Sequence, residues 1–123
     1  MSLQVVPIDV FPLIDRDKMP QVHQDTIPDL LVFLSQRNIE FAAGIIDPQL
    51  IKLHQEVDVE KAMAIPVEYL VHPILLAQDD FVLDGDHRAY RHWVNKTKVS
   101  FIQVKAPFVD AYKVVMEFTQ TLK

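Results

Sequence analysis

Two short apolar runs near the middle of the chain constrain its fold more than any other feature. ILLA at 74–77 and FVL at 81–83 are separated by the polar residues Gln78, Asp79 and Asp80. Short apolar runs joined by a few polar residues are typical of the two strands of a β-hairpin. We therefore expect an antiparallel hairpin at this point.

Signals for helices and further strands flank the hairpin. TIPD at 26–29 has the form of a capping box with proline in the first turn, and leucines follow at helical spacing, which predicts a helix over 27–37. Asp47-Pro48 predicts a second helix start, followed by Leu50, Leu53 and Val57 at helical spacing. Asp58 predicts a third helix start. We also expect an edge strand or arm over 4–14, a strand over 99–104 and a closing helix over 108–122. This order predicts an α+β domain with a small mixed β-sheet flanked by helices.

The segment after the hairpin, DGDHR at 84–88, brings together two carboxylates, a glycine, an imidazole and a guanidinium. When residues 87–96 are advanced by about 100° each, as a helix requires, an apolar face separates from a basic one. Ala89, Tyr90, Trp93 and Val94 share the first face, and Arg88, Arg91, His92 and Asn95 share the second. We therefore expect the chain to turn from strand to helix at Gly85.

Such a junction is a candidate site for an anion. The first turn of a helix has free N–H groups and the positive end of the helix dipole, and a glycine lets a ligand approach the backbone closely. Asp84 or Asp86 would then cap the helix, orient Arg88, or hold Mg²⁺ against a phosphate. The same residues also fit a plain folding motif, with Asp-Gly as a turn and Asp86 as an N-cap.

Composition narrows the classes of protein that need to be considered. The 123 residues suit one globular domain, and the absence of cysteine excludes thiol catalysis, disulfides and thiolate metal sites. The formal charge of −5 repels nucleic acid, so a DNA-binding role needs a local basic patch, for which 87–98 is the dense candidate. No apolar run approaches the roughly 18 residues of a membrane span, and no signal peptide is recognisable at the start. We expect a cytoplasmic protein without a membrane partner.

The stretch PILLAQDDFVLDGDHRAYRHWV, continued by KTKVSFIQVKAPFVDAYKVV, resembles the ParB/sulfiredoxin superfamily. In that superfamily a hairpin leads to a DGhHR-type motif, a helix, a strand and a final helix. LHQEVDVEKAMAI upstream resembles a segment shared by sulfiredoxin and archaeal free serine kinases. The resemblance covers about 47–118. It implies a ParB/sulfiredoxin-like domain over 47–123, with 1–46 as an N-terminal extension packed on that core.

The resemblance also implies roles for individual residues. Gly85, His87 and Arg88 match positions that bind nucleotide phosphates, and Lys61 matches a basic residue that reaches the same phosphates. Glu56 matches an acidic residue near the substrate hydroxyl. We therefore expect Glu56 and His87 to be catalytic. The expected nucleotide-binding residues are Lys61, Asp84, Gly85, Asp86, His87, Arg88 and Arg91. Arg91 departs from the small residue that the family has at its position.

Sulfiredoxin chemistry is excluded, because Asp86 stands where the catalytic cysteine would be. Three classes of function remain. The first class is binding of a nucleoside triphosphate, ATP or CTP with Mg²⁺, with hydrolysis or phosphoryl transfer to a small hydroxyl substrate. The second is a ParB-like nuclease or DNA-binding module that contacts phosphates through Arg88, Arg91 and His92. The third is a non-enzymatic interaction protein of a phage or mobile element with a degenerate site. The spacing of acids and histidines indicates no metal cluster.

The remaining histidines and aromatic residues have plainer interpretations. We interpret His23, His54 and His72 as structural or surface groups. Trp93 is expected to anchor the core through the apolar helix face. The aromatic residues of the closing helix, Tyr112 and Phe118, are expected to pack on the sheet.

Overall fold

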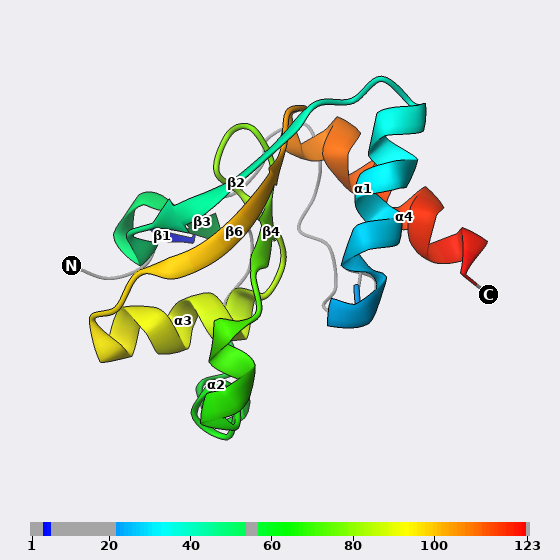
Figure 1. The fold of residues 1–123 in the computed structure, drawn as a ribbon. Helices are drawn as coiled ribbons and strands as arrows, with labels where there is room; N and C mark the ends of the chain where they lie inside the picture. Colours follow the sequence, from blue (N-terminus) through cyan, green and yellow to red (C-terminus); the bar gives the residue numbers. More distant parts are fainter. Residues whose placement is uncertain (1–3, 6–21, 54–56, 123) are drawn as a thin grey trace.

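The computed structural model describes residues 4–5, 22–53 and 57–122. A four-stranded sheet has the order β2 (Phe41–Ile46), β6 (Val99–Val104), β4 (Ile74–Leu76) and β5 (Val82–Asp84). Figure 1 shows β2, β6 and β4 side by side at the centre of the fold. β2 is antiparallel to β6, β6 is parallel to β4, and β4 is antiparallel to β5. The expected α+β class with a small mixed sheet is confirmed, as is the hairpin, whose turn places Asp80 at φ 70°.

Helices cover both faces of this sheet. α1 (Ile27–Gln36) and α4 (Phe108–Thr121) lie together at one end, while α2 (Val59–Met63) and α3 (Asp86–Asn95) lie at the other (Figure 1). Of the short 3₁₀ turns, η2 (Gln24–Thr26) leads into α1, η3 (Pro48–Leu50) joins β2 to β3, and η4 (Val67–Val71) joins α2 to β4. β1 (Gln4–Val5) pairs in parallel with β3 (Lys52–Leu53) as a separate small ladder.

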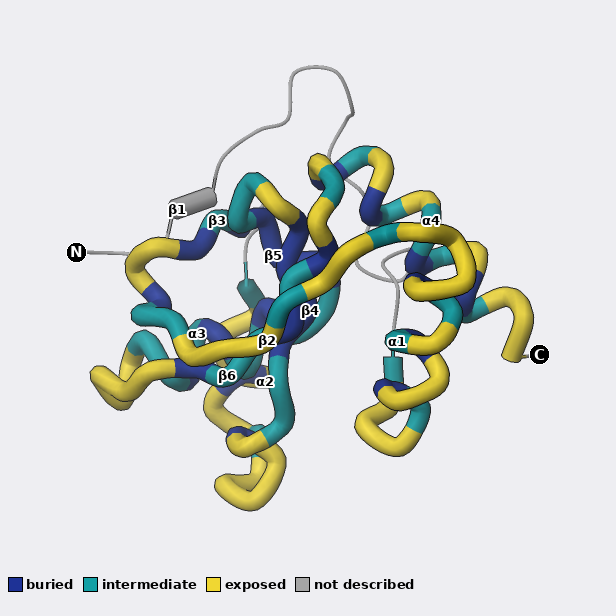
Figure 2. Tube along the Cα trace, turned by 45° about the horizontal axis from the view of Figure 1, so that its top comes forward, coloured by how far each residue is buried: buried dark blue, intermediate teal, exposed yellow. Residues whose placement is uncertain are grey.

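The alternation of side chains along the strands divides the interior into two cores. Leu75, Leu83 and Ile102 point to the face covered by α1 and α4. Ile74, Leu76 and Val82 point to the opposite face, where they pack with Ala89 of α3. β4 and β5 are buried on both faces, as Figure 2 shows, because helices cover both sides of them. Burial on both faces explains why their sequences are continuous apolar runs.

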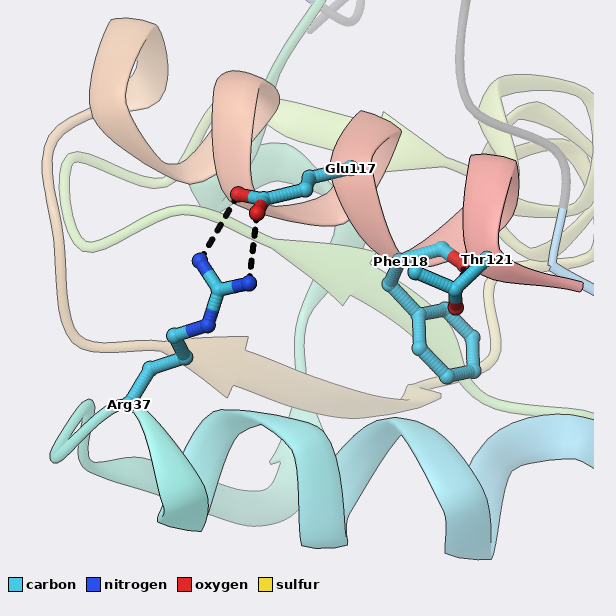
Figure 3. A network of polar contacts seen from close by, with 4 residues as sticks. All are labelled: Arg37, Glu117, Phe118 and Thr121. Carbon is cyan, nitrogen blue, oxygen red and sulfur yellow. Dashed lines mark hydrogen bonds and ion pairs between the residues drawn. The ribbon is translucent and has the colours of Figure 1, made fainter.

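A charged pair joins the outer sides of α1 and α4. Arg37, at the end of α1, donates to both carboxylate oxygens of Glu117, with a distance of 2.8 Å from Nη1 to Oε2 (Figure 3). Its guanidinium lies 4.5 Å from the centroid of Phe33, which contacts the ring of Phe118 at 5.4 Å. The hydrogen bond raises the pKa of Arg37 and lowers that of Glu117. Since both side chains are exposed, the pair adds little stability beyond the apolar contact beneath it.

One expectation about local structure is wrong, and one strand was not expected. The helix expected after Asp47 is a single 3₁₀ turn, capped by the Asp47 carboxylate, and the chain then enters β3 with Leu50 exposed and Leu53 buried. Residues 41–46 form an edge strand that we did not predict, because FAAGII contains alanines and a glycine, which are poor strand formers. Beside Gly44 of this strand lies the ring of Phe101 from β6, which covers the space that a side chain would fill.

Parts of 1–46 belong to the same fold as the rest of the described chain. β2 is an edge strand of the central sheet, and Leu30 and Leu34 of α1 are fully buried in the core that α4 also covers. Of the arm expected over 4–14, Gln4–Val5 is a strand and the remainder lies outside the described residues. Among the helices that the structure describes, none is long and apolar enough to cross a membrane.

Candidate functional site at the start of α3

The chain turns from β5 into α3 at Gly85, as the sequence predicts. Gly85 has φ 108°, in the left-handed region that favours glycine. A Cβ atom at this position would lie 2.6 Å from Cγ2 of Ile74 and 3.0 Å from Nη2 of Arg88. Glycine is therefore required twice, once for the backbone conformation and once for the close packing of strand, helix and guanidinium.

Arg88 lies across this glycine. Its Nη2 donates to the carbonyl oxygen of Pro73, just before β4, at 3.2 Å. Its Nε is buried and has no hydrogen-bond partner among the described residues. A buried donor without a partner is costly. The Nε of Arg88 is therefore a donor that an acceptor at the loop would satisfy.

Asp84 closes the strand end on the other side of the loop. Its Oδ2 accepts a hydrogen bond from the backbone N–H of Val22 at 3.0 Å. Desolvation raises the pKa of Asp84, and this effect outweighs the N–H groups of Val22 and Gly85 and the positive charges of Arg88 and His23, all of which lower it. The loop therefore contains a carboxyl group that holds its proton more strongly than an exposed aspartate does.

The remaining residues of the motif are at least partly shielded. Asp86, the first residue of α3, is buried, and His87 is half-buried in the first helical turn. The start of α3 thus combines a helix N-terminus with carboxylates from Asp84 and Asp86 and the guanidinium of Arg88. Two acids close to one cation leave little net positive charge, so a polyanion would need Mg²⁺ or the proton on Asp84 to reach this loop.

Arg91 has a structural position. Its side chain is buried, and Nη1 donates to the carbonyl oxygens of Ala62, Met63 and Ile65 at 3.1, 3.1 and 3.0 Å. Our expectation that Arg91 lies on an exposed basic face is wrong, because the C-terminal carbonyls of α2 attract its guanidinium into the interior. This contact joins α2 to α3.

The other predicted site residues are distributed as follows. Lys61 is exposed on α2, where its backbone N–H donates to the Asp58 side chain. Glu56 and His54 lie outside the described residues. His92 has Nε2 2.8 Å from the carbonyl oxygen of Leu70 and Nδ1 2.9 Å from the hydroxyl of Thr97. With Arg88 and Arg91, all three members of the proposed DNA-contacting face thus make polar contacts within the fold.

Sequence reasoning missed the contact of Val22 with Asp84, because no local pattern links positions 62 residues apart. Within the described ranges, no group of three or more acidic, histidine or cysteine side chains could hold a metal ion. We compared the chain with models of protein families, with curated proteins and with solved structures, and none of the three comparisons found a match. The ParB/sulfiredoxin-like assignment therefore stays a prediction.

Proposed function

We propose that the loop around Gly85 binds the phosphates of a nucleoside triphosphate, ATP or CTP, together with Mg²⁺. The observation that carries this proposal is the left-handed Gly85 against which Arg88 packs with one guanidinium nitrogen unused. Loops that pass a glycine into a helix N-terminus are common phosphate sites, and a guanidinium is the cation best suited to phosphate oxygens. The DGDHR resemblance to the ParB/sulfiredoxin superfamily supports the same ligand.

Each residue then has a distinct part in binding. Gly85 lets the phosphates approach the backbone, and Arg88 offsets their charge from beneath the loop. His87 in the first turn donates a hydrogen bond, and Mg²⁺ offsets the charge of Asp84 and Asp86. Transfer of a phosphoryl group to a hydroxyl substrate needs a base, and Glu56 is the residue we propose for it.

Calorimetric titration of the full chain with ATP, CTP and ADP in Mg²⁺ tests the proposal. We expect at least one nucleotide to bind and to raise the melting temperature, since a ligand that binds only the folded state stabilises it by about 2.7 kcal/mol at 100 times its Kd. His87→Ala and Arg88→Ala should each weaken binding by about tenfold or more, because each removes a hydrogen bond to a charged group.

The matched control is Lys113→Ala, which removes an exposed cation from α4 and should leave the affinity unchanged. Circular dichroism checks that each variant is folded. The proposal fails if folded wild-type protein shows neither heat of binding nor a change in melting temperature with any of the three nucleotides.

A further inference from the structure

A groove lies at the opposite end of α3 from Gly85. It has a volume of about 580 Å³ and is formed by η3, the last turn of α3 and the residues that follow it. Its apolar lining comes from Pro48, Trp93 and Val94, and Lys96 and Lys98 contribute the cations. The volume falls within the roughly 300 to 1,000 Å³ of small-molecule sites, so the groove can hold one small ligand.

Trp93 is the one tryptophan among the residues that line the groove. Its side chain is half-buried and tilts against Tyr90 at a centroid distance of 5.7 Å. Among the described residues its indole N–H has no acceptor. We expected Trp93 to anchor the core, whereas it lines the groove. A half-exposed indole with a free donor offers both a stacking surface and a hydrogen bond to a ligand.

The cations of the groove are not used by the fold. Lys96 and Lys98 are exposed, and in the part of the chain that the structure describes neither pairs with a carboxylate. The carboxylate of Asp47, the one acid of the lining, accepts from the backbone N–H and side-chain amide of Gln49 at 3.1 Å each and keeps its charge, so the lining has two cations against one acid. The two ammonium groups thus remain available to an anion.

The end of α3 holds these groups at the rim. Lys96 adopts φ 58°, a left-handed conformation that ordinarily favours glycine. Its backbone N–H donates to the carbonyl oxygen of Trp93 at 3.2 Å, and the N–H of Thr97 donates to that of His92 at 2.9 Å. These bonds satisfy the carbonyls of His92 and Trp93 without the lysine side chains.

We infer that this groove binds a small planar aromatic anion, with its ring against Trp93 and its anionic group between Lys96 and Lys98. One aromatic wall and two cations match one ring with one charged group. A nucleic-acid strand, which would need a run of stacking residues and a basic surface, fits less well with a formal charge of −5. The anionic group can be a phosphate or a carboxylate, and the inference does not depend on the function proposed for Gly85.

Fluorescence gives a site-specific test, because Trp93 is the single tryptophan of the chain. The full chain is titrated with AMP and with benzoate, and with their uncharged counterparts adenosine and benzamide. We expect at least one of the two anions to change the fluorescence and to bind about tenfold or more tightly than its counterpart. A response to AMP alone identifies a phosphate as the preferred group, and a response to benzoate alone identifies a carboxylate.

Variants separate the groove from the rest of the surface. Lys96→Gly combined with Lys98→Ala should weaken binding by about tenfold or more, and glycine suits the left-handed backbone at 96 so that folding is preserved. Lys105→Ala combined with Lys113→Ala removes the same charge elsewhere and should leave binding unchanged. The inference is overturned if neither anion changes the fluorescence, or if both pairs of substitutions have equal effects. If neither anion changes the fluorescence but AMP binding appears as heat and is lost in Arg88→Ala, the inference is overturned and the site at Gly85 is supported.

Discussion

Gly85 is the residue on which the strand-to-helix junction depends. The chain contains two glycines, and they have different environments. Gly85 combines a left-handed backbone with a space already occupied by the fully buried Ile74. Gly44 lies in a regular strand, and what limits its space is the edge of the Phe101 ring. A methyl group is therefore far harder to accommodate at position 85 than at position 44.

We predict that Gly85→Ala lowers the free energy of unfolding by about 1 to 3 kcal/mol, the usual cost of a residue held in an unfavourable backbone region. Urea denaturation measures this change. Gly44→Ala is the matched control and should cost less, since the half-buried Phe101 ring can shift. Equal stability of Gly85→Ala and wild-type protein would show that neither the conformation nor the contact with Ile74 limits this position.

At the scale of elements, α2 depends on its contact with α3. A helix of five residues has almost no stability of its own, so its ends must be held by other groups. The Asp58 side chain accepts from the N–H of Lys61 at the start, and Arg91 donates to three carbonyls at the end. Lys61 therefore lies on a helix whose position depends on the hydrogen bonds from the buried Arg91 of α3.

We predict that Arg91→Met lowers the free energy of unfolding by about 1 to 3 kcal/mol, because the methionine fills similar space but leaves one buried and two partly buried carbonyls without this donor. Hydrogen exchange should also become faster in α2 and stay unchanged in α4. Lys113→Met, at an exposed position of α4, serves as the control. Unaltered exchange in α2 would contradict the role that we assign to Arg91.

For the whole molecule, Asp84 links segments that are distant in the sequence. It ends β5, precedes the loop of α3, and accepts the backbone N–H of Val22, which lies just before η2 and α1. The folded protein raises the pKa of this carboxyl group above its ordinary value of 3.8, chiefly through desolvation. The folded state therefore binds this proton more strongly than the unfolded state, and its contribution to stability falls as the pH rises above 3.8.

We predict that Asp84→Asn removes this pH dependence. The amide oxygen of asparagine still accepts from Val22 but carries no charge, so the variant should gain stability relative to wild-type protein as the pH rises above 3.8. Melting temperatures of both proteins across the acidic and neutral range measure the difference. Glu68→Gln, at an exposed acid, should show no such trend. A variant that instead loses stability relative to wild-type protein with rising pH would show that the charged carboxylate is favourable.

Local patterns in the sequence were sufficient for the elements with strong signals. The hairpin, the helix starting near Ile27, the turn at Gly85 and the closing helix all follow from turn residues, capping residues and apolar spacing, which act over a few positions. β2 had no such signal, because its strand pairing with β6 connects residues about sixty positions apart. The 3₁₀ turn at Pro48 likewise depends on Leu53 being drawn into β3 and the interior.

The sequence by itself determined where the chain turns, which residues gather at the start of α3 and that glycine stands at its most constrained point. Tertiary structure alone decided the direction of each charged side chain. Helical spacing placed Arg91 with Arg88 on one basic face, yet Arg91 is buried because its guanidinium donates to carbonyls of α2. The same spacing placed Trp93 on the apolar face, yet Trp93 lines a groove together with Lys96 and Lys98. The physical reason is that a side chain's charge is local, whereas the partners that satisfy it are supplied by whichever distant elements pack against it.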